Sequence, residues 1–315
     1  MPGLWRTPLT WAIGLVTDTM MNQHIRDQLS ALKNDHMLCC GRLTLTTNVP
    51  IPTSDVTGAT TVYFTPFRGN LIAVHDGDHW QVLAFSQLAI ALGSDAANTN
   101  YDVFAYYSSG AVAIERTAWT NDSTRAVALT TLDGVYVKSS DTTRRYIGTY
   151  RTTGTVGQTE DSASKRLVWN YYNRVPRNLR VLETTDSWTY TTAARRQANN
   201  NTANQVAVVI GVAEVAVNVF VSVVGSNTTA GVNFSASIGA DSTSTEAANV
   251  IMNYTTAQVA GYGIAAAASL VTMPAAGYHF YAWLEYSNAS GTTTWYGDAA
   301  VPTVMQSGIF GRTEA

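Results

Sequence analysis

The sequence predicts a mainly β protein with a short N-terminal helix, a β-rich middle module and a C-terminal antiparallel β-sandwich of jelly-roll type. Charged residues make up only 13% of the 315 residues, about half of the usual ~25%, and helices need such residues on their solvated faces. Thr, Ser, Asn and Val are abundant instead, and short β-branched runs alternate with Gly/Asn/Ser clusters that are typical of turns. Aromatic residues reach 10%, which argues against disorder.

Three regions follow from composition. Residues 1–40 form an N-terminal anchor, residues 41–177 form the middle module, and residues 178–315 form the C-terminal sandwich. The last boundary rests on a shift in charge. Beyond residue 178 the only basic residues are Arg180, Arg195, Arg196 and Arg312.

A helix is expected over about residues 18–34, with Thr17 or Asp18 as its N-cap. Its apolar residues recur every three or four positions and form one stripe. An isolated helix of this length is marginal in water, so the stripe must pack on its own subunit or on an assembly partner. Two nearby tryptophans favour the partner. The anchor residues are therefore Trp5, Trp11, Met21, Ile25, Leu29 and Leu32.

In the middle module, residues 71–74 and 79–83 read as a hairpin around Asp76-Gly77, a strong turn signal. Residues 101–107 and 111–115 read as a second hairpin. Further strands are expected at 41–46 and 60–65 in this module, and at 215–223, 232–238, 277–286 and 292–296 in the sandwich.

Two C-terminal segments carry special expectations. The apolar run 206–224 has nearly the length of a membrane span, but Glu214 and alternating β-branched residues favour two buried strands joined near residue 213. No membrane insertion is expected. Strand 277–286 is bulky on both faces, so we expect a cover on both sides, the second of which a neighbouring subunit could supply.

No motif predicts catalysis, a cofactor or a metal site. The run His75-Asp76-Gly77-Asp78-His79 contains metal-ligand types, but it spans the hairpin turn and no distant ligand accompanies it, which favours a solvated turn. No nucleophile or phosphate-loop motif occurs. The net charge of −3 gives no footprint for nucleic acid. Cys39 and Cys40 are adjacent, and this argues against a disulfide framework and for folding in a reducing compartment.

The aromatic residues suggest a binding role. Tyr281, Trp283, Trp295 and Tyr296 lie among Thr, Asn and Ser, and flat rings beside small polar groups suit sugar binding. The same residues also fit a sandwich core or a subunit interface, so both readings stay open here.

The N-terminal half resembles the structural proteins of tailed phages, namely tail, fibre or minor virion proteins. The resemblance covers roughly residues 5 to 177. It rests on Trp5-x-x-Pro8-x-Thr10-Trp11-x-x-Gly14-x-Val16-Thr17, on Met21-Asn22-x-x-Ile25-Arg26-Asp27-x-Leu29-x-x-Leu32, and on the segments 56–70, 101–106 and 165–175.

The resemblance implies a viral protein of the virion, assembled in the cytoplasm of a bacterial host. It implies a homotrimeric fibre that attaches to other head or tail proteins by its N-terminal region. The C-terminal sandwich would then be a receptor-binding tip for a bacterial surface glycan. Two alternatives remain open: a purely structural capsid decoration, head fibre or tail adaptor, and a tailspike that degrades polysaccharide. The lack of a catalytic motif favours a non-enzymatic protein.

Overall fold

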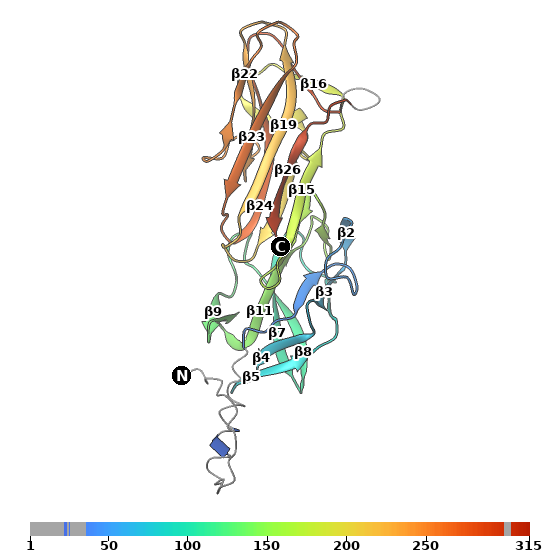
Figure 1. Cartoon of the computed structure of the whole chain (residues 1–315), viewed down its shortest axis with the longest axis vertical. Helices are drawn as coiled ribbons and strands as arrows, with labels where there is room; N and C mark the ends of the chain where they lie inside the picture. Colours follow the sequence, from blue (N-terminus) through green and yellow to red (C-terminus); the bar gives the residue numbers. More distant parts are fainter. Residues whose placement is uncertain (1–21, 24, 26–35, 299–303) are drawn as a thin grey trace, which may run out of the picture.

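The computed structural model describes residues 22, 23, 25, 36–298 and 304–315. These residues form strands β1 to β26 and one 3-10 turn, η1 (Ala198–Asn200), so the chain is mainly β as predicted. Figure 1 shows an elongated molecule with β4, β5 and β9 toward one end and β22 and β16 toward the other. We call these the proximal and the distal end, because the described chain after residue 36 begins beside β4.

The proximal part contains three sheets. A three-stranded sheet has the order β1-β3-β6, a hairpin pairs β4 with β5, and a six-stranded sheet has the order β8-β7-β11-β10-β9 with β14 on β11. The strands are β1 (Gly41–Thr44), β3 (Thr61–Pro66), β4 (Leu71–His75), β5 (Trp80–Ala84), β6 (Leu88–Ala91), β7 (Asn100–Ser108), β8 (Ala111–Ala118), β9 (Leu129–Leu132), β10 (Val135–Lys138), β11 (Asp141–Arg151) and β14 (Val168–Asn170).

The distal part contains two larger sheets. One has the order β2-β12-β13-β18-β24-β20-β22 with β17 on β24, and the other has the order β15-β26-β19-β23-β21 with β25 on β19 and β16 on β25. The strands of the first are β2 (Val56–Ala59), β12 (Thr159–Asp161), β13 (Lys165–Arg166), β17 (Arg195–Gln197), β18 (Gln205–Ile210), β20 (Asn233–Ala240), β22 (Tyr254–Thr256) and β24 (Gly277–Ser287). Those of the second are β15 (Pro176–Leu182), β16 (Ser187–Tyr190), β19 (Val217–Asn227), β21 (Ile251–Met252), β23 (Ile264–Thr272), β25 (Thr293–Tyr296) and β26 (Gly308–Glu314).

The two distal sheets enclose one core, because alternate residues of each strand point inward. On β19 the valines 217, 219, 221 and 223 are buried while Phe220 is exposed. The run 206–224 thus forms two strands, β18 and β19, one in each sheet, which confirms that prediction. Within the described part of the chain, no helix is long and apolar enough to span a membrane.

The predicted hairpins also form. β4 and β5 pair around Asp76 and Gly77, with Gly77 at a φ of +109°, and β7 pairs with β8. Positive φ is nearly free for glycine and costly for other residues, which explains why the Asp-Gly signal located the turn correctly.

The proximal and distal parts share their main core. Phe104, Tyr146 and Trp169 of the proximal part belong to the same buried cluster as the aromatic residues of the distal sheets. A Cβ atom on Gly211 would lie 2.1 Å from Tyr146 Oη. Strand β15 crosses the expected boundary at residue 178, and β2, β12 and β13 extend a distal sheet. The two parts therefore pack as one body.

Strand β24 is covered on both faces within the single chain. Tyr281 and Trp283 face the core, whereas Ala282 and Leu284 on the other face are also fully buried. The loop 241–250 lies over that outer face. A Cβ on Gly239 would lie 2.2 Å from Ser242 O and 3.2 Å from Leu284 Cδ1, and Ala247 N donates to Ile238 O. The chain itself supplies the second cover.

Most of the expected helix at 18–34 lies outside the described residues. Asn22, Gln23 and Ile25 are helical and exposed, and the helix as a whole stays a prediction.

Candidate functional site

A groove of about 560 Å³ opens on the outer face of the first distal sheet. Strands β17, β20, β22 and β24 and the loop 241–250 contribute its walls. Its lining residues are Ala194, Arg195, Asn233, Phe234, Ser235, Glu246, Tyr254, Tyr286 and Asn288.

The strand register creates the groove. Ser235 on β20 pairs with Tyr254 on one side and with Tyr286 on the other, and Tyr286 pairs with Arg195. Residues directly opposite one another on antiparallel strands project from the same face of the sheet. The row Tyr254–Ser235–Tyr286–Arg195 thus sets one small side chain between two large rings, and this leaves a hollow.

The groove lies far from the proximal part. At its first residues β24 touches the proximal part, where Tyr278 N donates to Asp122 O across 2.9 Å. Tyr286 lies eight residues further along the same strand, which corresponds to about 26 Å. β22 lies near the distal end in Figure 1, so the groove lies toward the end opposite residue 36.

The cation and the anion of the groove are paired. Arg195 Nε lies 3.0 Å from Glu246 Oε2, and the guanidinium also donates to Ser235 O and Met252 Sδ, each across 3.3 Å. Its central carbon lies 5.3 Å from the centre of the Tyr286 ring. Burial lowers the pKa of Arg195, an effect opposed by the Glu246 carboxylate. The formal charges of the lining side chains cancel.

These groups suit a polyhydroxylated ligand. Tyr254 is 71% exposed and offers its ring for stacking, and the two asparagines offer amide groups. Aromatic faces beside amide donors and a carboxylate acceptor match the C–H faces and hydroxyls of a sugar.

No pattern in the sequence indicates this site. Tyr254, Tyr286 and Arg195 come from distant segments and follow no common motif. The predicted receptor residues Tyr281, Trp283 and Trp295 are instead core residues, exposed by 1%, 0% and 0%. They occupy inward positions of their strands and belong to the main core, so no receptor can reach their rings on this surface. Tyr296 is half-buried, and its hydroxyl lies 3.1 Å from Ser226 Oγ.

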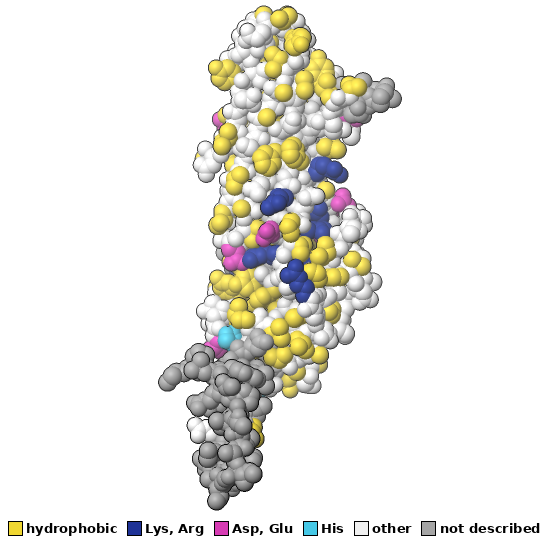
Figure 2. All heavy atoms as spheres, in the orientation of Figure 1, with side chains coloured by type: hydrophobic (Ala, Val, Ile, Leu, Met, Phe, Trp, Pro, Cys, Tyr) yellow, Lys and Arg dark blue, Asp and Glu magenta, His cyan; other side chains and the backbone are white. Residues whose placement is uncertain are grey.

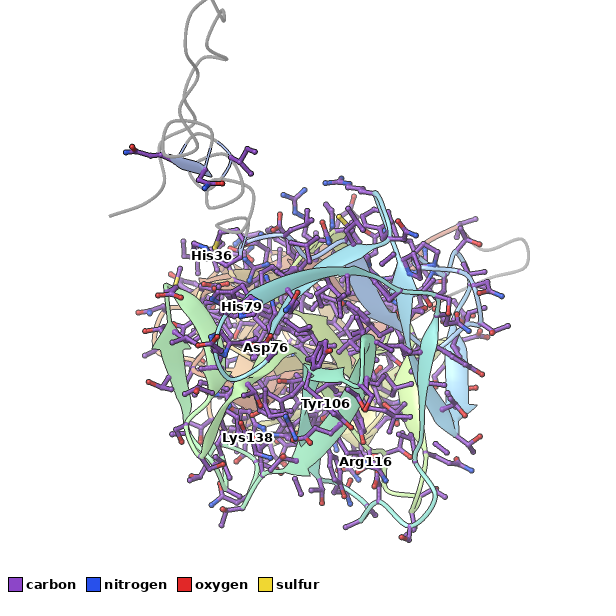
Figure 3. The ribbon with its side chains drawn as sticks, turned by 90° about the horizontal axis from the view of Figure 1, so that it is seen from below. His36, Asp76, His79, Tyr106, Arg116 and Lys138 are labelled. Atoms are coloured by element: carbon purple, nitrogen blue, oxygen red, sulfur yellow. The ribbon has the colours of Figure 1, made fainter. Side chains whose placement is uncertain are left out.

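The His75–His79 run forms a self-contained turn at the proximal end (Figure 3). The amides of His79 and Asp78 and the side chain of Gln81 donate to Asp76, and these bonds hold the pKa of Asp76 well below its usual range. His75 pairs with Trp80 and not with His79. Within residues 36–298 and 304–315, no group of three or more His, Cys, Asp or Glu side chains is arranged to hold a metal ion.

The predicted anchor residues Trp5, Trp11, Met21, Leu29 and Leu32 lie outside the described residues. Ile25 is described, and it is 49% exposed. The segment that begins at residue 36 is bonded to β4 through Arg145. This side chain is fully buried and donates to the carbonyl oxygens of His36, Leu38 and Ala73.

No family and no curated protein matches the sequence. Among solved structures, the insecticidal delta-endotoxin Cry8Ea1 from Bacillus thuringiensis is similar with a TM-score of 0.25 and 8% identity, over 87% of this chain and 51% of that one. The structure of infectious bursal disease virus (Gx strain) is similar with a TM-score of 0.24 and 12% identity, over 82% of this chain and 69% of that one. The chain spans about half the length of the endotoxin. Likeness at this level carries no argument about function.

Proposed function

We propose that this protein is a non-enzymatic phage fibre that attaches to the virion by its N-terminal region and presents its distal groove to a glycan of the bacterial surface. The observation that carries the proposal is the row Tyr254–Ser235–Tyr286–Arg195, which forms a sugar-sized groove on the distal part. We propose in addition that the N-terminal helix expected from the sequence forms, and that the distal strands follow a jelly-roll-like order.

The position of the groove supports attachment at one end of the molecule and recognition at the other. Arg145 donates to the backbone oxygens of residues 36–38 and to Ala73 O of β4 at the proximal end, so the anchor segment joins the body there. The groove lies at the distal part of the same elongated molecule (Figure 1). The resemblance of residues 5–177 to tailed-phage virion proteins supplies the setting, since a fibre needs attachment at one end and recognition at the other.

The proposed homotrimer has support from a second, apolar surface. On the outer face of the other distal sheet, Phe220 and Phe310 are 39% and 44% exposed and stack with ring centres 5.7 Å apart. Ile251, 76% exposed, lies in the same row across the sheet through Ser269. The upper part of this face carries almost only hydrophobic and uncharged side chains (Figure 2). Such patches are typical of association surfaces.

Self-association is tested by light scattering on the purified full-length chain. We expect the mass of a trimer, and we expect Phe220→Asp to shift that mass toward the monomer, since an interface cannot bury an unpaired charge. A monomeric wild type at micromolar concentration contradicts the trimer. Sites repeated in a trimer would strengthen a weak sugar contact by avidity.

The anchor is tested on the particle. Replacing Ile25 and Leu29 together with Asp should abolish incorporation into virions, while the circular dichroism of the β-rich body stays unchanged. Incorporation at the normal level contradicts anchoring through this segment.

Recognition is tested by adsorption competition. Host cells are incubated with excess protein, and free phage is counted after mixing. Wild type should block adsorption. Tyr254→Ala and Tyr286→Ala should weaken direct glycan binding by about tenfold. Tyr107 is an exposed tyrosine of the proximal part, and Tyr107→Ala should leave glycan binding unchanged. If wild type neither blocks adsorption nor binds an array of bacterial glycans, a structural decoration or adaptor role replaces recognition. Release of reducing sugar ends would instead identify a polysaccharide-degrading tailspike.

A further inference from the structure

Resting on the proposed glycan recognition, we propose that the groove selects neutral sugars and that Glu246 is the residue that excludes anionic ones. Tyrosine rings alone do not decide whether the bound sugar is neutral or anionic.

The arginine of the groove is not free for an anionic ligand. Arg195 Nε is paired with Glu246 Oε2, and its other two nitrogens donate to Ser235 O and Met252 Sδ. Its side chain is only 17% exposed. A sugar carboxylate would have to displace Glu246 to form the forked ion pair that arginine prefers.

Glu246 itself faces the ligand space. Both its contacts within the described residues use Oε2, since Ser237 Oγ approaches the same atom at 3.4 Å. The side chain is 41% exposed, and Oε1 remains available as an acceptor. That oxygen can take a hydrogen bond from a sugar hydroxyl, whereas an anionic sugar would meet a like charge.

The asparagines supply the complementary donors. Asn233 Oδ1 accepts from Thr256 Oγ1 across 2.7 Å, and Asn288 Oδ1 accepts from Ser290 N across 3.1 Å. Because both amide oxygens are engaged, the Nδ2 groups are the atoms left for a ligand. The groove thus offers amide donors and one carboxylate acceptor, which matches hydroxyls that both donate and accept, without a free cation for a carboxylate.

The test compares one oligosaccharide in two charge states. An acidic bacterial oligosaccharide rich in uronic acid is compared with its carboxyl-reduced derivative, and both are titrated by calorimetry against the full-length wild type. We expect the reduced, neutral form to bind at least about tenfold more tightly. An increase in NaCl from about 0.02 M to about 0.5 M should narrow that ratio, because salt screens the repulsion.

Glu246→Gln keeps the side-chain shape and leaves Arg195 uncompensated. Binding of the acidic form should rise by about tenfold or more, whereas binding of the neutral form should not rise, because its hydroxyls lose a charged acceptor. Glu314→Gln on the other sheet should change neither. If wild type binds the acidic oligosaccharide as tightly as the neutral one, the selection by charge is overturned, but glycan recognition is not. Selection without any response to Glu246→Gln overturns the role of Glu246. No binding of any glycan by wild type overturns the proposed function, and this inference with it.

Discussion

Trp188 donates its indole N–H to Glu285 Oε2 across 2.6 Å inside the distal core. Arg196 Nε lies 2.7 Å from the other carboxylate oxygen, and Glu285 is fully buried. Burial raises the pKa of Glu285 to about 6, although both donors act in the opposite direction. The buried carboxyl therefore couples the stability of the fold to pH.

The first prediction concerns that coupling. A carboxyl with a raised pKa holds its proton more tightly in the folded protein, so its contribution favours folding below about pH 4.5 and is lost as pH rises through about 6. We expect the free energy of unfolding of wild type, minus that of Glu285→Gln, to fall by about 2 kcal/mol between pH 4 and pH 7. Urea denaturation at several pH values measures this difference. Glu314→Gln is the control, and a difference that rises with pH contradicts the prediction.

The second prediction separates core aromatics from groove aromatics. Trp295 is fully buried, with its ring 5.4 Å from that of Phe234, so Trp295→Ala should lower the free energy of unfolding by about 3–5 kcal/mol. Tyr254→Ala should change it by less than about 0.5 kcal/mol, because that ring is exposed. Denaturation curves of the two variants test the contrast. Equal losses would show that Tyr254 has a structural role and not a binding one.

The third prediction concerns the shared core of the two parts. A Cβ on Gly211 would lie 2.4 Å from Trp169 Cε3 as well as against Tyr146. Gly211→Ala should therefore lower the free energy of unfolding by about 1–3 kcal/mol, in one transition seen by fluorescence and by far-ultraviolet circular dichroism alike. Gly154→Ala is the control, because the nearest atom to its Cβ lies 4.0 Å away. Two separate transitions would mean that the parts unfold independently.

The fourth prediction concerns Arg145. Its guanidinium binds the backbone oxygens of residues 36–38 and lies 4.6 Å from the centre of the Tyr172 ring. Arg145→Met removes these bonds and leaves partly buried carbonyl oxygens without their donor, which favours local opening. Hydrogen exchange of a peptide over residues 36–42 should quicken by at least about tenfold. Arg180→Met on β15 is the control, and unchanged exchange would show that other contacts hold the segment.

Much of the secondary structure could be predicted because its causes are local. The Asp76-Gly77 signal located the β4–β5 hairpin, and the alternation of valines around Phe220 identified β19. Bulky residues on both sides of β24 correctly predicted two covers. The source of the second cover could not be predicted, because the loop 241–250 lies over that face only through the tertiary pairing of β20 with β24.

The candidate site could not be predicted for the same reason. Tyr281 and Tyr286 lie on the same strand and look alike in the sequence, yet one is buried and the other lines the groove. Opposite faces of a strand carry alternate residues, so the residue type alone does not say which face becomes the core.

The sequence by itself determined the β character, the positions of many strands and turns, and the low charge, because these depend on residue size, branching and backbone freedom within a few positions. The tertiary structure decided which aromatic residues are accessible and which partners surround them. Arg195, Ser235, Tyr254 and Tyr286 become neighbours only through the pairing of four strands, and that register is selected by burial of a core to which segments throughout the chain contribute.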